Sequence, residues 1–176
     1  MDDIIVIDDF LSEEELVKMT SASTYKNDNW VIHGSHPRGS NGLETVGDFQ
    51  TSFLKRYLID NEYYTSYLFN KIKKFFNYNY KLVDVYLNGH EPLRDGSFHI
   101  DGDADRTVIL YITPWKASFG GFTHFLKSEK EHSVIAPLYG RMINFNSNIP
   151  HKAYSFSNQN CPMRITAAFK LKLCMY

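Results

Sequence analysis

The sequence reads Asp-Gly-Ser-Phe-His-Ile-Asp at residues 95–101, and its core is the pair formed by His99 and Asp101. Side chains alternate between the two faces of a β-strand, so residues two apart project in the same direction. We therefore expect a strand over residues 97–101 that brings the imidazole and the carboxylate to one point. Such a pair is able to hold a metal ion.

A metal site at this pair needs a third protein ligand. One imidazole and one carboxylate are two of the three ligands of the facial triad, which leaves coordination positions open and is typical of non-haem Fe(II) oxygenases. The third ligand is best supplied by His151, which follows the turn at residues 147–150 and begins a short strand. His124 and His132 compete for the same role.

The last expected strand, residues 164–173, places Arg164 and Thr166 on one face. The planar guanidinium group binds a carboxylate through two parallel hydrogen bonds. An arginine buried inside a small barrel without an anion would be costly. Hence either Arg164 lies on the outer face of the barrel, or a carboxylate ligand meets it.

Bulk composition excludes several classes of protein. The 176 residues suffice for one domain with a hydrophobic core, and the net charge of -1 argues against a protein built to coat nucleic acid or an anionic membrane. Residues 1–9 have no basic region and a short apolar run, so we expect neither a signal peptide nor a membrane span. The two cysteines, Cys161 and Cys174, are too few for a disulfide framework, which favours an intracellular, cytoplasmic protein.

Two helices are expected in the first part of the chain, after a short strand at residues 4–7. Ser12 and Glu15 form a capping box, which predicts a helix to about Ser21 or Ser23 that buries Leu16 and Met19. A second helix is predicted over residues 60–76. Its apolar stripe consists of Tyr64, Leu68, Ile72 and Phe75.

Between the helices, residues 27–47 are polar and glycine-rich, which predicts a long loop, and its His33 to Gly42 part is a candidate lid. After Asn77 the chain changes to short strands separated by turn residues, which indicates a jelly roll with the helices on its outer face. We expect one domain over residues 1–176, with 1–79 as helical support and lid and 80–176 as the core. The strands are predicted at residues 80–87, 97–101, 106–113, 121–125, 133–135, 141–145, 151–153 and 164–173.

Taken in order, the motifs between residues 80 and 173 resemble those of the Fe(II)/2-oxoglutarate-dependent oxygenases, in particular the prolyl 4-hydroxylase-like branch with its short bacterial and phage forms. His99-x-Asp101 and His151 resemble the iron triad of that family. Arg164-x-Thr166 resembles its Arg-x-Ser/Thr, which holds the distal carboxylate of 2-oxoglutarate. Tyr111 matches the tyrosine that donates to the same carboxylate.

Further segments carry the same resemblance. Residues 120–125 look like the family's Gly-Gly-x-Thr-x-Phe hairpin, residues 137–145 like its Pro-x-x-Gly strand, and residues 9–15 like its opening strand-to-helix segment. The chain departs from the hypoxia-sensing members six residues after the arginine, where they have a tryptophan near the substrate and this chain has Lys170. The connection at residues 88–96 is also longer than in animal prolyl hydroxylases.

The resemblance implies a mainly β protein with flanking α-helices around a cupin-like double-stranded β-helix. It implies Fe(II), 2-oxoglutarate and O2 as reaction partners, ascorbate as an accessory, and hydroxylation of a C–H bond with release of succinate and CO2. Tyr86 and Asn88, from the strand before the metal pair, are weaker candidates for co-substrate or substrate contact, and Tyr86 also fits the role of a core tyrosine.

Three functions stay open at this point. The first is hydroxylation of a peptide or protein, of prolyl type. The second is the same chemistry on a free amino acid, another small metabolite or an alkylated base, although no basic groove suggests a nucleic-acid strand. The third is a catalytically silent jelly roll that serves as a binding module. The sequence names neither the substrate nor the oligomeric state.

Overall fold

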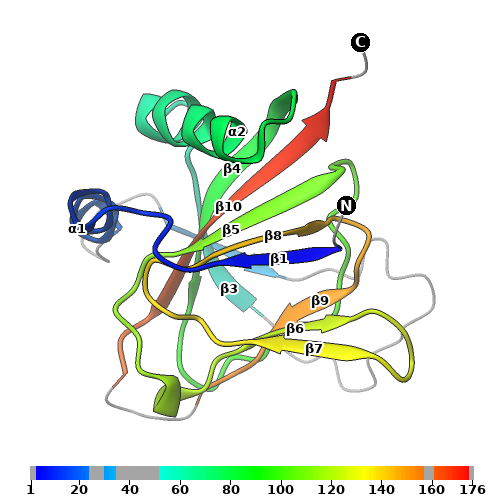
Figure 1. Ribbon diagram of the computed structural model, residues 1–176. Helices are drawn as coiled ribbons and strands as arrows, with labels where there is room; N and C mark the ends of the chain where they lie inside the picture. The colour runs from blue at the N-terminus through cyan, green and yellow to red at the C-terminus, as the bar shows by residue number, and fades with distance from the viewer. Residues whose placement is uncertain (1–2, 24–29, 35–51, 157–160, 175–176) are drawn as a thin grey trace.

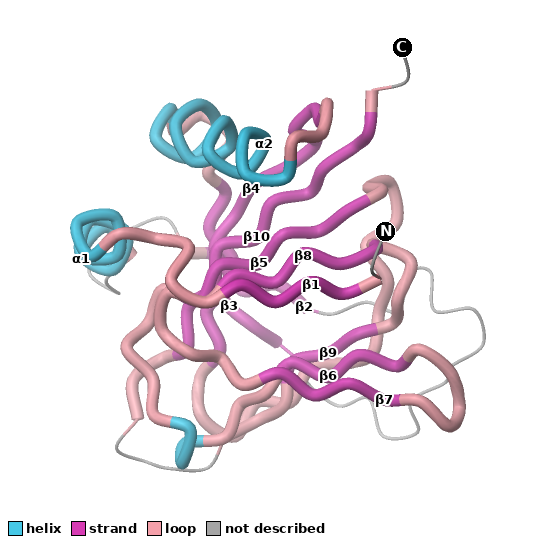
Figure 2. The backbone as a smooth tube through the Cα atoms, in the orientation of Figure 1, coloured by secondary structure: helices cyan, strands magenta, loops and turns pink. Residues whose placement is uncertain are grey.

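Two antiparallel β-sheets face each other in the computed structural model, which describes residues 3–23, 30–34, 52–156 and 161–174 (Figures 1 and 2). The larger sheet has the order β1 (Ile4–Ile7), β8 (Met142–Asn146), β5 (Arg106–Tyr111), β10 (Arg164–Leu173), β4 (Tyr80–His90), β3 (Ser52–Tyr57), β2 (Val31–Gly34). The smaller sheet has the order β7 (His132–Ile135), β6 (Thr123–Leu126), β9 (His151–Ala153). This is the double-stranded β-helix predicted from the sequence.

The first helix, α1 (Glu13–Ala22), begins as its capping box predicts. The hydroxyl of Ser12 accepts from the Glu15 amide at 3.3 Å, and the Glu15 carboxylate accepts from the Ser12 amide at 2.6 Å. The Glu15 carboxylate also accepts from Tyr67 at 2.9 Å and forms an ion pair with Lys71 at 2.5 Å, so it ties α1 to the second helix. Met19 is fully buried, as predicted.

The second helical segment combines a π-helical turn, η1 (Tyr63–Leu68), with α2 (Phe69–Phe76). Tyr64, Leu68 and Ile72 are buried as expected, but Phe75 is 51% exposed, so its predicted place in the core is wrong. Phe76 packs against the core instead. Phe75 contacts the ring of Phe10 edge-to-face at a centroid distance of 5.4 Å.

Both helical segments cover one face of the larger sheet, on the side away from the smaller sheet (Figure 1). This face contributes Val85 and Leu87 from β4 and Phe169 from β10 to the main core. Because side chains alternate along a strand, the intervening residues of β4 and β10 point toward the smaller sheet. A second core fills part of the space between the sheets and consists of Ile109, Tyr111, Phe125, Ile135, Ile143 and Phe145.

Several predicted boundaries differ from the structure. Residues 97–101 do not form a strand: His99 makes an isolated bridge to His151, and the flanking residues are irregular. The first 79 residues supply β1, β2 and β3 to the larger sheet besides the helices, and residues 31–34 are strand where a loop was predicted. The candidate lid was predicted at His33 to Gly42, and its residues 35–42 lie outside the described residues. The single-domain division stays a prediction.

One short connecting helix, η2 (Ala117–Phe119), completes the described elements. In the part of the chain that the structure describes, no helix is long and apolar enough to cross a membrane.

Candidate metal centre and adjoining pocket

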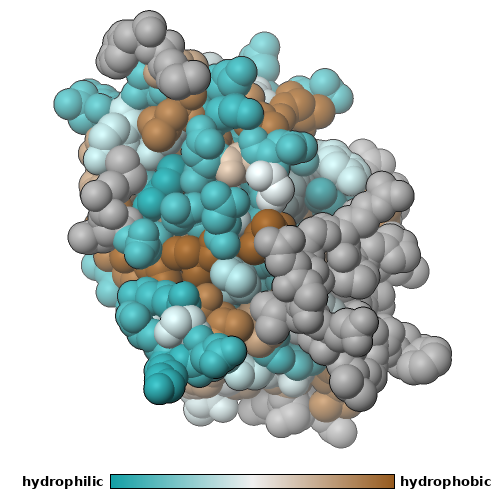
Figure 3. Space-filling view, turned by 90° about the vertical axis from the view of Figure 1, so that its right-hand side faces the viewer, coloured by the Kyte–Doolittle hydropathy of each residue, from teal (hydrophilic) through white to brown (hydrophobic). Residues whose placement is uncertain are grey.

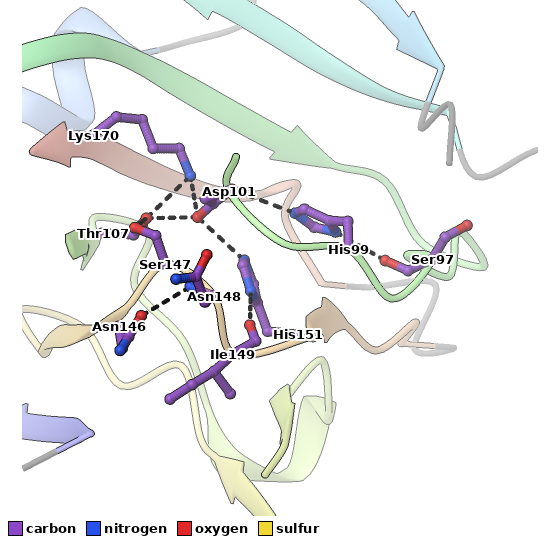
Figure 4. A network of polar contacts seen from close by, with 10 residues as sticks. All are labelled: Ser97, His99, Asp101, Thr107, Asn146, Ser147, Asn148, Ile149, His151 and Lys170. Atoms are coloured by element: carbon purple, nitrogen blue, oxygen red, sulfur yellow. Dashed lines mark hydrogen bonds and ion pairs between the residues drawn. The ribbon is translucent and has the colours of Figure 1, made fainter. Parts of the chain in front are cut away.

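His99, Asp101 and His151 converge at one end of the space between the sheets (Figure 4). One potential ligand atom from each lies within 4.8 Å of the other two, and this is the one such group of three among the described residues. Nε2 of His99 lies 3.8 Å from Oδ1 of Asp101, and Nε2 of His151 lies 3.5 Å from Oδ2. The competing candidates His124 and His132 lie outside this group.

The segment that carries His99 and Asp101 is not a regular strand. A few backbone hydrogen bonds hold it beside His151 instead. The amide of His99 donates to the carbonyl of His151 at 3.1 Å, and the reverse bond measures 2.9 Å. The amide of Asp101 donates to the carbonyl of Ser147 at 2.9 Å. The segment at residues 99–101 is thus fixed to β9 and to the turn before it.

Both histidines are oriented by their second ring nitrogen. Nδ1 of His99 bonds to the carbonyl of Ser97, and Nδ1 of His151 bonds to the carbonyl of Ile149, each at 2.9 Å. A carbonyl only accepts, so each Nδ1 carries the proton and each Nε2 keeps its lone pair for a metal. Burial lowers the pKa of His151 to about 3, which keeps the ring in the neutral form that binds metals.

Asp101 has one oxygen fully engaged by protein groups. Its Oδ2 accepts from the Thr107 hydroxyl at 2.6 Å and forms an ion pair with Lys170. The Thr107 hydroxyl is itself 3.0 Å from that of Ser147. Burial alone would raise the pKa of Asp101, but the charge of Lys170 and its hydrogen bond outweigh burial and hold that pKa below its usual range. The carboxylate is therefore ionised and fixed in direction.

Arg164 lies on the inner face of β10, which decides between the two orientations left open by the sequence. It is buried, and its Nη1 donates to the carbonyl of Gly121. Its Nη2 donates to Nδ1 of His90 at 3.4 Å, while its Nε has no partner in the described ranges. No carboxylate pairs with Arg164 among the described residues. A buried guanidinium group without a counter-ion is a site for an anionic ligand.

One cavity connects Arg164 with His99 and His151 of the candidate metal centre. Thr166, Tyr86 and Asn88 line it, so the structure places these candidates beside the centre. Tyr111 is fully buried and does not line the cavity directly. Its hydroxyl contacts that of Thr123 at 2.6 Å, and Thr123 lines the cavity.

The sequence patterns predict no role in the site for His90, Thr107, Thr123 or Lys170. Thr123 stands out in the sequence only as part of the hairpin motif, and Lys170 only as a departure from the hypoxia-sensing enzymes. For two of the four residues, the alternation of side chains along β4 and β10 would have predicted that they face the cavity. His90 continues the row of Tyr86 and Asn88, but the predicted strand ended at residue 87. Lys170 continues the row of Arg164 and Thr166.

The protein resembles known proteins in its three-dimensional structure rather than in its sequence. No family model and no curated protein matches the sequence. A 2OG-Fe(II) oxygenase family oxidoreductase from Burkholderia pseudomallei has a TM-score of 0.72 at 13% identity, over 97% of this chain and 85% of that chain. The fold is that of the 2-oxoglutarate/Fe(II) oxygenases.

Two further structures with this oxygenase fold were solved with different ligands. A prolyl hydroxylase from Trichoplax adhaerens, in complex with a peptide fragment of the hypoxia inducible factor oxygen degradation domain, has a TM-score of 0.72 at 16% identity, over 98% of this chain and 84% of that chain. A Streptomyces hygroscopicus protein with nickel, 2-oxoglutarate and hygromycin B bound has a TM-score of 0.63 at 9% identity, over 99% of this chain and 84% of that chain.

Proposed function

We propose that the protein is an Fe(II)- and 2-oxoglutarate-dependent dioxygenase that hydroxylates a C–H bond. The observation that carries this proposal is the buried, unpaired Arg164 in the same cavity as the His99, Asp101 and His151 group. An anion site and a metal site side by side suit a co-substrate that is both a chelator and a carboxylate.

The residues present fit both groups. Two neutral imidazoles and one carboxylate are the donor set of a non-haem Fe(II) centre with open positions. The free Nε of Arg164 is an unsatisfied donor for a carboxylate, with Thr166 on the same face of β10 and Thr123 on the opposite wall. His99, Asp101 and His151 would hold the iron, and Arg164 the distal carboxylate of 2-oxoglutarate.

The bound groups would supply the oxidising chemistry, and the protein supplies binding and orientation. The balance is R–H + 2-oxoglutarate + O2 → R–OH + succinate + CO2. O2 gains four electrons, two from the C–H bond and two from the oxidative decarboxylation, and one oxygen atom enters each organic product. CO2 leaves from the 2-oxo acid.

The surrounding residues serve this reaction by restricting motion and water. Lys170 and Thr107 hold Asp101, and His90 accepts from Arg164, so both charged groups have a fixed direction. Phe145 packs its ring edge on His151 at a centroid distance of 4.6 Å. This apolar wall keeps water from the protein side of the centre, which strengthens electrostatic interactions inside it.

For the substrate, we propose a prolyl-type peptide as the first class to test. The complex of the Trichoplax adhaerens protein with a peptide supports this choice. The hygromycin B bound to the Streptomyces hygroscopicus protein supports a small molecule equally well, so small substrates belong in the same screen. If the protein binds no Fe(II), the hypothesis of a catalytically silent binding module remains.

An anaerobic titration tests the proposal. The metal-free protein receives Fe(II) and then 2-oxoglutarate, and the visible metal-to-ligand charge-transfer band is followed. We expect a band in the wild type, no band in Asp101→Ala, and a band that needs at least about tenfold more 2-oxoglutarate in Arg164→Lys, which keeps the charge but loses the fork.

The exposed Lys74 on α2 provides the matched control, Lys74→Met, which should titrate like the wild type. A folded wild type that gives no band would contradict the proposal and leave the binding-module reading.

A further inference from the structure

Two polar groups beside the centre are not accounted for by iron or 2-oxoglutarate. Oδ1 of Asn88 on β4 is buried and has no hydrogen-bond partner in the part of the chain that the structure describes. Nζ of Lys55 on β3 has no ion pair among the residues that the structure describes. Lys55 and Asn88 are cross-strand partners in the antiparallel ladder. Such partners share a face of the sheet and lie close together, and Asn88 lines the cavity.

The unpaired oxygen of Asn88 requires a donor. At neutral pH 2-oxoglutarate carries two carboxylates and a keto group, all of them acceptors, and a metal ion held by three other residues does not donate a hydrogen bond. Neither group can therefore satisfy Asn88. A buried acceptor without a partner destabilises the protein until a donor reaches it. The primary substrate is the remaining component of the reaction, and an N–H or O–H group on it would meet this need.

Lys55 is a buried cation that faces the same side. It is 9% exposed, and its Nζ lies 3.6 Å from the ring centroid of Tyr86 and 4.5 Å from that of Tyr57. Tyr86 lines the cavity next to the metal site. Burial lowers the pKa of Lys55, and the charges of Asp84 and Lys170 also act on it. The two tyrosine rings stabilise the ammonium group in part, but they supply no counter-ion.

Among the residues that the structure describes, the charged side chains around the cavity leave a net charge of one positive unit. Lys152 pairs with Asp95 at 2.8 Å, and Lys170 pairs with Asp101. Arg164 and Lys55 remain as cations, with Asp84 near Lys55 as the remaining anion. Fe(II) and 2-oxoglutarate, with charges of opposite sign and equal size, add nothing to this sum. A substrate with one negative charge balances it.

We propose that the primary substrate carries a carboxylate that binds Lys55, beside an N–H group that donates to Asn88. This pair of groups, with a neutral N–H, occurs in the C-terminal residue of a peptide. A free amino acid is the second source of the carboxylate, but its amino group is a cation and its net charge is zero. The inference rests on the proposed function and narrows its substrate class. An internal residue of a peptide has the N–H group but lacks the carboxylate.

The test compares matched compounds on the enzyme loaded with Fe(II) and 2-oxoglutarate. The probes are free amino acids including L-proline, short peptides that end in the same residues, and the C-terminal amides of both sets. Succinate release is measured, and the rate without probe is subtracted. We expect stimulation by the carboxylates and a KM at least about tenfold higher for the amides, because the amides lack the charge-assisted hydrogen bond to Lys55.

Variants assign the effect to the two residues. Lys55→Met should raise KM for the best carboxylate probe at least about tenfold and raise KM for 2-oxoglutarate less, while Lys55→Arg should recover part of the loss. Asn88→Ala should weaken the N–H probes and affect carboxylates without an N–H group less. Lys74→Met is again the control.

Each outcome decides between the hypotheses. If the charge-transfer band does not form, the proposed function fails and takes the substrate class with it. If the band forms but amides equal acids, no carboxylate stimulates, or Lys55→Met keeps the wild-type KM, the substrate class alone is overturned. Because the acid-to-amide comparison uses the wild type, it holds even if a variant fails to fold. The free and peptide-bound arms distinguish the two sources of the carboxylate.

Discussion

The ammonium group of Lys170 forms an ion pair with Oδ2 of Asp101, and the hydroxyl of Thr107 donates to the same oxygen at 2.6 Å. The two side chains of the ion pair are 12% and 6% exposed, so the contact lies away from bulk water. With Oδ2 held from two directions, Oδ1 is the oxygen directed toward His99. Lys170 therefore positions the carboxylate of the candidate metal centre.

Lys170→Met should weaken Fe(II) binding or activity by about 10–100-fold, the usual cost of removing a partner that orients a metal ligand. The measurement is an anaerobic Fe(II) titration of the metal-free protein. Lys172→Met on the same strand is the control, because Lys172 is exposed. Unchanged Fe(II) affinity in Lys170→Met would show that the ion pair has no part in positioning Asp101.

The same ion pair predicts a stability effect in the metal-free protein. Asp101→Asn leaves the ammonium group of Lys170 buried without an anion, so the free energy of unfolding should fall by about 3–5 kcal/mol. Adding Lys170→Met removes the unpaired charge and should recover much of the loss. Urea unfolding of both single variants and the double variant gives the coupling energy, and strictly additive effects would contradict the prediction.

The β-strand period explains why so much of the larger sheet was predictable. The row of Arg164 and Thr166 on β10 follows from alternation alone, and β10 has the predicted bounds. The convergence of His99 with Asp101 was predicted from a strand that does not exist. Their approach depends on long-range bonds to His151 and Ser147, which no local pattern encodes.

Other features lay beyond local patterns for physical reasons. The strand β3 contains Lys55 and Arg56 within a short run, so its alternation was weak, and its place is fixed by pairing with β4. Phe75 and Phe76 follow Ile72 by three and four residues in α2, and both spacings fit one helix face, so the sequence pattern alone does not decide which ring packs against the core. The ion pair between Lys170 and Asp101 joins residues far apart in sequence, and only the folded sheet brings them together.

Removal of the Thr123 hydroxyl and removal of the Tyr111 hydroxyl should weaken 2-oxoglutarate binding to different extents. Thr123 lines the cavity, whereas the hydroxyl of Tyr111 reaches it through its 2.6 Å contact with Thr123. Thr123→Val should raise the dissociation constant of 2-oxoglutarate about tenfold, the value of one lost hydrogen bond to a charged group, and Tyr111→Phe should raise it less. Anaerobic titration of the charge-transfer band measures both. A larger effect of Tyr111→Phe would indicate that Tyr111 contacts the carboxylate directly.

The neutral ring of His90 beside Arg164 should make the stability of the metal-free protein depend on pH. Arg164 only donates, so Nδ1 of His90 accepts and the ring is neutral; burial and the charge of Arg164 hold the pKa of His90 well below its usual 6.5. Below about pH 6.5 the unfolded chain therefore binds a proton that the folded chain excludes, and stability is lost as pH falls. We expect the free energy of unfolding, measured with urea from pH 7.5 to pH 5, to fall less steeply in His90→Gln than in the wild type. The two slopes should differ by up to about 1.4 kcal/mol per pH unit. Lys74→Met, on the exposed side of α2, should keep the wild-type slope. Equal slopes in the wild type and His90→Gln would contradict the neutral ring beside Arg164.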